Sequence, residues 1–192
     1  MARRPTAQSD AVDLMLEQWR RERPDVDASA LAVFGRLHRS FNRYQEQLAR
    51  LFLDFDLSIS SFSVLAALRR QGSPYRCTAG QLADTSLVST GGITQRVDRL
   101  EKEGLVRRDR DPDDRRVVYV ALTDKGLAVV DEVAEAHFAN EARMISALTS
   151  TERTQLARLL SRLEQSLDLA ELQNREERYP AAQGKGSGSS PK

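Results

Sequence analysis

Apolar residues recur every three or four positions along most of the chain, which is the spacing of helices that bury one face. The pattern predicts helices over 11–22, 29–54, 60–70, 78–84, 89–103, 123–147 and a last one from 150 onward. Residues suited to N-caps stand at the start of several of these helices: Thr78, Ser89, Thr123, and either Thr149 or Ser150. Pro24 and Gly104 mark two helix ends, because proline cannot continue a helix and glycine suits the conformation just beyond one. The chain is therefore predicted to be mainly α-helical.

Two short segments, 105–108 and 116–122, are instead rich in aliphatic and β-branched residues and flank the turn sequence DPDD. This pattern predicts an antiparallel β-hairpin. The hairpin directly follows two short helices that are joined by a tight turn and preceded by a third helix. That order is typical of a winged helix-turn-helix, in which the hairpin is the β-wing.

The apolar stripes at 34–52 and 156–167 lie outside this unit, and neither end of the chain can bury its own stripe. Leaving them in water would cost on the order of tens of kcal/mol, so we predict a homodimer formed by the N- and C-terminal helices. The predicted organisation is a flexible arm (1–10), N-terminal dimerisation helices (11–58), a DNA-binding lobe (59–122), C-terminal dimerisation helices (123–172) and a disordered, Gly/Ser-rich tail (173–192).

Charge and composition narrow the function classes. The 192 residues are 30% charged but carry a net charge of only +1, which argues against coating nucleic acid by bulk charge and still allows a local basic patch. One cysteine and two histidines exclude a disulfide framework and the CxxC and HExxH metal motifs. The sequence also contains no Walker loop, GxGxxG or GxSxG motif, so we expect neither an enzyme nor a cofactor.

No apolar run in the sequence reaches the ~18–20 residues needed to cross a bilayer. The single cysteine, Cys77, is interpreted as a small buried residue rather than a redox switch. We therefore expect a protein of the reducing cytoplasm.

The helix over 89–103 has the most informative face. Ile93, Val97 and Leu100 share its buried side, and Gly91, Gln95, Arg99 and Lys102 point the other way. Gln95 can form a bidentate pair with adenine, and Arg99 can reach a phosphate. Ser89, Thr90 and Gly91 lie at the helix N-terminus, which attracts phosphate. This face fits a helix that enters the major groove of DNA; an ordinary solvated helix is the alternative.

The hairpin segment 107–116 contains five arginines and four aspartates. An arginine at a hairpin tip can enter a narrow minor groove, and aspartates can hold arginine side chains by paired hydrogen bonds. A solvated charged turn is the alternative. The hairpin follows directly after a candidate recognition helix, and this position favours contact with DNA over a solvated turn.

These segments resemble the MarR-type winged helix-turn-helix transcriptional regulators over about residues 31–168. The resemblance is carried by DRLEKEGLVRR, DPDDRR and LTDKG within 87–126. It implies a triangular dimer with intertwined terminal helices, and a sequence-specific repressor whose affinity for its operator falls when a small molecule binds. Many members carry a wing arginine where this chain has Asp113, so we assign the minor-groove role to Arg115 and expect Arg116 to pair with Asp114.

A narrower resemblance links the chain to the subgroup that responds to urate or related purines. It rests on an additional N-terminal helix bearing Trp19, followed by ERPDVD and GRLHR. It implies a ligand pocket that uses Trp19, Arg96 and an aspartate at the position where this chain has Ser63. Because this carboxylate is missing, the ligand could be urate, another purine, a phenolic, or another anionic or aromatic molecule. Arg96 falls about 70° from the centre of the buried stripe, so it could face such a pocket.

Two histidines, His38 and His137, lie on predicted helices among polar neighbours. Either could reach the ligand pocket, and a histidine in solvent or at the edge of the core is the alternative. For the whole chain, the alternative to a ligand-responsive repressor is a winged-helix architectural or protein-interaction module without an effector. A regulator would protect one palindrome and release it with a small molecule, whereas an architectural protein would bind many sequences alike.

Overall fold

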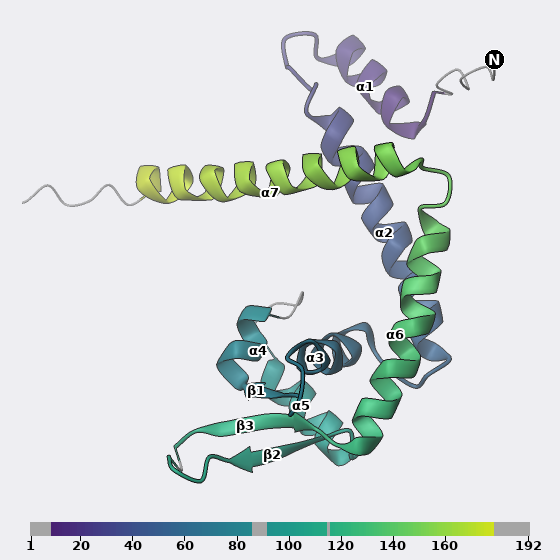
Figure 1. Cartoon of the computed structure of the whole chain (residues 1–192). Helices are drawn as coiled ribbons and strands as arrows, with labels where there is room; N and C mark the ends of the chain where they lie inside the picture. The colour runs from purple at the N-terminus through teal and green to yellow at the C-terminus, as the bar shows by residue number, and fades with distance from the viewer. Residues whose placement is uncertain (1–8, 86–91, 115, 179–192) are drawn as a thin grey trace, which may run out of the picture. The chain divides into compact units, whose positions relative to one another are not determined.

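The computed structural model describes residues 9–85, 92–114 and 116–178, and the chain divides into two compact units between Ala139 and Asn140. The elements, in order, are α1 (Ala11–Glu22), α2 (Leu31–Leu53), α3 (Ile59–Arg70), β1 (Arg76–Thr78), α4 (Ala79–Thr85), α5 (Ile93–Lys102), β2 (Val106–Arg110), β3 (Val118–Leu122), α6 (Asp124–Met144) and α7 (Ser150–Arg178) (Figure 1). The predicted fold class, mainly α with a small β-wing, is confirmed.

The lobe formed by α3, α4, α5 and the sheet has an aliphatic core of its own. The largest side chains in it that are completely buried are Leu65, Leu68, Leu82 and Leu100. The sheet is antiparallel with strand order β1-β3-β2. Only the β2–β3 hairpin is predicted from the sequence; β1 is an additional strand, in which Cys77 lies opposite Val120. Cys77 is buried as expected, and burial raises the pKa of its thiol.

Helix α5 begins later than predicted. The sequence predicts Ser89 as the N-cap, but the helix begins at Ile93, because Gly92 has φ +93° and so leaves the helical conformation. Residues 86–91, which include Ser89, lie outside the described part of the chain. The predicted end is confirmed: Gly104 has φ +71°, and the Leu105 N–H donates to the carbonyl oxygen of Leu100 at 2.9 Å.

The N-terminus of α6 lies directly on the turn between α5 and β2. Thr123 caps α6 as predicted, because its Oγ1 accepts the Gly126 N–H at 3.0 Å. The same hydroxyl donates to the carbonyl oxygen of Gly104 at 2.7 Å. A Cβ at Gly126 would lie 1.9 Å from the carbonyl oxygen of Leu105. The two backbone segments are therefore so close that only glycine fits at residue 126.

Helix α1 has the predicted bounds and packs on α2 (Figure 1). Val12 of α1 is completely buried, and a Cβ at Gly35 of α2 would lie 3.1 Å from its Cγ1. Arg36 of α2 forms ion pairs with Asp10 (Nε–Oδ2, 2.9 Å) and Asp13 (Nη2–Oδ1, 2.6 Å). Small side chains and an ion-pair network therefore fix α1 to α2.

Helix α7 is longer than predicted. Thr149 rather than Ser150 is its cap: the Glu152 N–H donates to Thr149 Oγ1 at 3.3 Å, and Glu152 Oε2 accepts the Thr149 N–H at 2.8 Å. The helix continues to Arg178, so the first residues of the predicted disordered tail are helical. An i,i+4 ion pair between Arg175 and Glu171 supports these last turns. Within the described residues, no helix has the length and apolar character to cross a membrane.

Candidate nucleic-acid interface

Helix α5 presents the face predicted for it. Ile93, Val97 and Leu100 are buried, and Gln95, Arg99 and Lys102 are exposed. Thr94 is exposed as well, although its residue type alone does not single it out as a candidate. Because the apolar side anchors α5 in the lobe, its polar side is free to meet another molecule.

The N-terminus of α5 adds a second chemical feature. The N-cap is Gly92, which has no side chain to accept hydrogen bonds from the first backbone N–H groups. Such groups carry the positive end of the helix dipole and bind phosphate oxygens. Three predicted DNA-binding residues, Ser89, Thr90 and Gly91, precede this point and lie outside the described residues.

The Arg99 side chain forms an ion pair at the surface of α5. Its Nε lies 2.9 Å from Glu103 Oε1, one helical turn away. The arginine side chain is well exposed, and an exposed i,i+4 pair contributes only about 0.3–0.5 kcal/mol. Arg99 can therefore exchange this partner for a phosphate at small cost.

The turn of the wing is organised by aspartates. Asp111 Oδ1 accepts the backbone N–H groups of Asp114 (3.0 Å) and Asp113 (2.9 Å), and these bonds lower the pKa of Asp111. The expected pairing of Arg116 with Asp114 needs correction, because the observed bond runs from the Arg116 backbone N–H to Asp114 Oδ1 at 3.0 Å. The exposed Arg116 side chain is thus not the group that makes this bond. Arg115 lies outside the described residues.

Arg108, in β2, has a role that the charge pattern of the sequence does not single out. Its Nη2 lies 2.5 Å from Asp98 Oδ1, its Nη1 pairs with Glu101, and its backbone N–H donates to Glu101 Oε1 at 3.2 Å. Both carboxylates belong to α5. The alternation of the strand could have revealed it, because Arg108 shares a face with the buried Val106.

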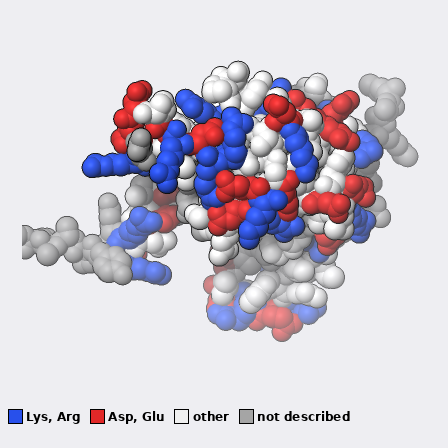
Figure 2. All heavy atoms as spheres, turned by 90° about the horizontal axis from the view of Figure 1, so that it is seen from below, with Lys and Arg blue, Asp and Glu red and all other residues white. Residues whose placement is uncertain are grey.

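The charges on this part of the molecule alternate in sign. Seen from below (Figure 2), basic and acidic side chains lie next to one another rather than forming one continuous basic surface. The ion pairs of Arg99, of Arg108 and of Arg107 with Asp109 (Nε–Oδ2, 3.0 Å) agree with this picture. Nucleic acid would therefore be bound here through individual contacts rather than through a surface of net positive charge.

The predicted ligand residues are not brought together by one chain. Trp19 is half-exposed on α1 and Arg96 is half-buried on α5, and these two helices lie near opposite ends of α2 (Figure 1). His38 is exposed on α2, where its Nε2 lies 3.1 Å from Asn42 Nδ2, and Ser63 is half-buried on α3.

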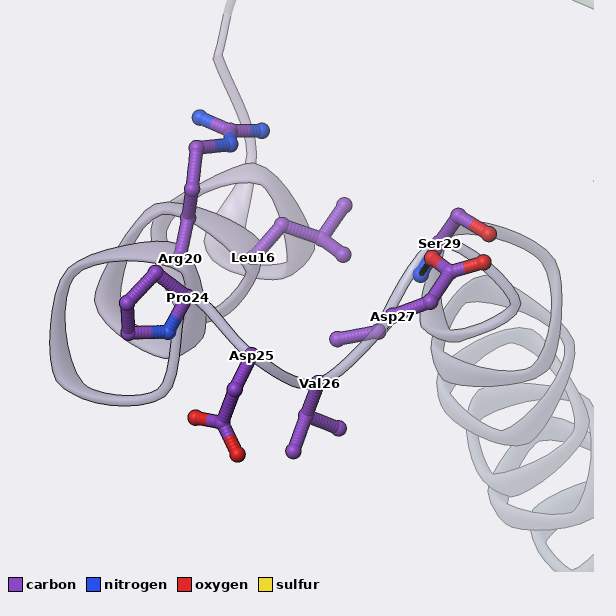
Figure 3. A pocket seen from close by; sticks show the side chains of 8 residues that line it. Leu16, Arg20, Pro24, Asp25, Val26, Asp27 and Ser29 are labelled. Atoms are coloured by element: carbon purple, nitrogen blue, oxygen red, sulfur yellow. Dashed lines mark hydrogen bonds between the residues drawn. The ribbon is translucent and has the colours of Figure 1, made fainter.

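A cavity of about 460 Å³ lies between α1 and the segment that leads to α2 (Figure 3). Its lining residues are Leu16, Arg20, Pro24, Asp25, Val26, Asp27, Ala28 and Ser29. Asp27 accepts the Ser29 N–H at 2.9 Å, and Asp25 pairs with Arg23. None of the predicted ligand residues lines this cavity, although Trp19 precedes Arg20 in α1.

His137 lies at the edge of the core, which is the alternative that the sequence leaves open for it. The rings of Phe62 and Phe52 lie against it, with centroids 5.0 and 5.7 Å away. Its buried ring is thus part of an aromatic cluster at the edge of the core. The described residues contain no group of His, Cys, Asp and Glu side chains that could hold a metal ion.

Comparison with known proteins agrees with this geometry. A family model described as the MarR family matches residues 55–117. The HTH-type transcriptional regulator PecS of Dickeya dadantii is 38% identical over 153 residues, which cover 80% of this chain and 92% of PecS.

Two solved structures share the fold. A cysteine-to-serine variant of MarR from E. coli in complex with operator DNA is 26% identical with a TM-score of 0.61, covering 72% of this chain and 99% of that one. Bordetella bronchiseptica BpsR, whose DNA binding is regulated by 6-hydroxynicotinic acid, is 27% identical with a TM-score of 0.62, covering 69% of this chain and 92% of that one. The chain thus belongs to the MarR family, whose members are DNA-binding transcription regulators with a winged helix-turn-helix and not enzymes.

Proposed function

We propose that the protein is a repressor that binds a palindromic operator as a homodimer and leaves it when a small anionic or aromatic molecule binds. The observation that carries this proposal is the exposed polar face of α5 beside the β2–β3 wing. The likeness to a MarR structure in complex with operator DNA supports it.

The homodimer would cover apolar side chains that one chain leaves in water. On α2 these are Val33, Phe34, Leu37 and Phe41, and on α7 they are Leu156, Leu159, Leu160 and Leu167. We therefore assign dimerisation to segments 11–58 and 123–172, and DNA binding to 59–122. A two-fold dimer places two recognition helices about one turn of DNA apart, which requires a palindromic site.

In this proposal the DNA contacts divide into two kinds. Gln95 reads a base edge in the major groove. Arg99 and the N-terminus of α5, with Ser89, Thr90 and Gly91 before it, hold phosphates. In the wing, Arg115 enters the minor groove, and Arg116 contacts the DNA next to Arg115.

Selection of bound duplexes from a random pool tests this division. Gln95→Ala should relax the preferred sequence at one position in each half-site, at a cost of about 1–3 kcal/mol on the preferred duplex. Arg99→Ala should weaken all duplexes alike and lower the slope of log affinity against log salt by about one. The same altered preference in both variants would contradict the division. Similar affinity of the unchanged protein for every duplex would indicate an architectural protein instead.

The effector is proposed to bind near Trp19 and Arg96, with His38 and Ser63 as further candidates. Because α1 and α5 lie apart in one chain, the pocket would need the assembled dimer. A planar anion, such as a purine or a phenolate, could stack on the indole and pair with the guanidinium. The small acid that regulates BpsR belongs to this chemical class.

Fluorescence of Trp19, the single tryptophan, tests the pocket directly. A ligand that releases DNA should quench it and should lose its effect on the Trp19→Phe and Arg96→Ala proteins. A ligand that releases DNA and still acts on both variants would place the pocket elsewhere. Urate should act more weakly on this protein than on its Ser63→Asp variant, and an equal response would show that the missing carboxylate does not matter.

A further inference from the structure

Arg108 joins the first strand of the wing to the helix that we propose to read DNA. We propose that it is a positioning residue: by holding Asp98 and Glu101 it fixes the rotation of α5 about its own axis, and so sets sequence preference without touching DNA. The inference rests on the proposed role of Gln95 in reading a base.

The contact geometry is that of a two-point clamp. One terminal nitrogen of the guanidinium lies 2.5 Å from Asp98, and the other pairs with Glu101. The two carboxylates are three residues apart and so lie on the same flank of α5. The backbone N–H of Arg108 also donates to Glu101, at 3.2 Å. A planar guanidinium can span two carboxylates in this way, whereas a lysine ammonium is a single point charge.

The place of Arg108 in the strand separates it from its neighbours. It shares a face of β2 with the buried Val106, and its cross-strand partner Val120 is buried too. Its side chain is 32% exposed, compared with 54% for Arg107, which pairs with Asp109 in the same strand. An arginine whose guanidinium is held by two carboxylates of α5 is not poised to reach a phosphate.

Helix α5 needs such a clamp because its apolar anchor is narrow. Ile93, Val97 and Leu100 form one stripe. Such a stripe opposes separation of the helix from the lobe more strongly than rotation of the helix about its own axis. A side chain about 6 Å from the helix axis moves by about 2 Å when the helix rolls by about 20°. That displacement is enough to break a bidentate hydrogen bond from Gln95 to a base. The clamp acts on the flank opposite Arg96, so it opposes rolling in a direction that the buried stripe leaves open.

The test uses the full-length protein, a duplex that the wild-type chain selects from a random pool, and a scrambled duplex of the same composition. The ratio of the two dissociation constants and its salt dependence are measured for Arg108→Gln, Arg108→Lys, Asp98→Asn and the double variant Arg108→Gln/Asp98→Asn. Arg107→Gln, which breaks an ion pair inside the strand, is the matched control. Urea unfolding of each variant confirms that it is folded.

Both Arg108 variants and Asp98→Asn should lower the specificity ratio roughly tenfold and leave the salt slope unchanged, because no phosphate contact is lost. The double variant should lose no more than Arg108→Gln alone, since the residues act as a pair. Arg107→Gln should keep the wild-type ratio. If Arg108→Gln does not fold, Asp98→Asn and Arg108→Lys carry the same test.

Three results would overturn the positioning role. They are a wild-type ratio in the Arg108→Lys protein, a salt slope lowered by about one in Arg108→Gln, and an equal loss in Arg107→Gln. The first would show that the two-point geometry of the guanidinium is not needed, and the second would make Arg108 a direct phosphate contact. If the wild-type chain selects no duplex at all, the proposed sequence-specific function fails and this inference fails with it.

Discussion

The winged lobe and helix α7 use the same residue, leucine, in opposite ways. In the lobe, Leu65, Leu68 and Leu100 have no exposed surface. In α7, Leu156, Leu159, Leu160 and Leu167 are 42–53% exposed. The lobe therefore completes its core within one chain, whereas α7 forms a regular helix whose apolar side needs a surface from elsewhere.

Polar contacts show the same difference. In the lobe they link elements far apart in sequence, as Thr123 does with Gly104. Those observed for α7 are local: Thr149 with Glu152, and Arg175 with Glu171. Local contacts favour a helix but do not hold it in a fold. The lobe therefore stabilises the single chain, whereas α7 provides the apolar side that we propose to form the dimer interface.

The largest effect is expected from placing charge on the apolar stripe of α7. In Leu160→Asp/Leu167→Asp, each change removes a leucine that would contribute about 1.5–3 kcal/mol when buried and puts a carboxylate in its place. The dimer should be lost at micromolar concentration. Sedimentation velocity measures this.

Gln165→Asp is the matched control, because residue 165 lies on the side of α7 opposite the stripe. It should remain dimeric. If the double variant sediments as a dimer as well, α7 is not the interface and the contrast between the two regions disappears.

A smaller and different effect is expected inside the lobe. Leu100→Ala removes a completely buried side chain and should lower the free energy of unfolding by about 2–5 kcal/mol. Because Leu100 is buried within one chain, this loss should be the same at all protein concentrations, as measured by urea unfolding. A loss that vanished at high concentration would show that the lobe, too, depends on the partner.

The smallest effect concerns α1, which is held by ion pairs as well as by Val12. Backbone hydrogen bonds within the capping box and the Arg36 guanidinium lower the pKa values of Asp10 and Asp13 below 3.8. Their contribution to docking α1 is therefore fully present above pH 3.8 and is lost as the pH falls through the lowered values. Amide exchange in α1 should accelerate there before exchange in the lobe does.

Arg36→Gln should move this loss of protection in α1 to higher pH. Arg23→Gln serves as the control, because Arg23 pairs with Asp25 in the segment after α1 and does not reach α2. Simultaneous acceleration in α1 and the lobe would mean that the two regions open as one.

Local sequence signals predict the helices well and the sheet only in part. The bounds of α1, the stop at Gly104 and the cap at Thr123 follow from side-chain chemistry within a few residues. Strand β1 has no such signal, because its three residues are defined by pairing with β3, more than forty positions later. Ser89 has the right chemistry for a cap, yet the backbone of Gly92 decides where α5 begins.

The same division holds for the candidate site. Periodicity places Gln95 and Arg99 on the exposed side of α5, since one helix determines that side. The sequence suggests that Arg116 and Asp114 interact, but only the folded turn shows that the backbone N–H makes the bond. In the sequence, Arg108 cannot be distinguished from the neighbouring arginines. Only the packing of β2 against α5 shows that it pairs with Asp98.

The close approach at Gly126 has a consequence for the DNA itself. Where α6 meets the turn after α5, backbone faces backbone, and no rotamers are available there to absorb a change of angle. In the proposed dimer, the distance between the two recognition helices is then set by the protein. Inserting one base pair between half-sites shifts one of them by about 3.4 Å and turns it by about 34°. The duplex would have to twist or bend to compensate, so the tolerance of an operator to altered spacing would depend on how easily its central base pairs deform.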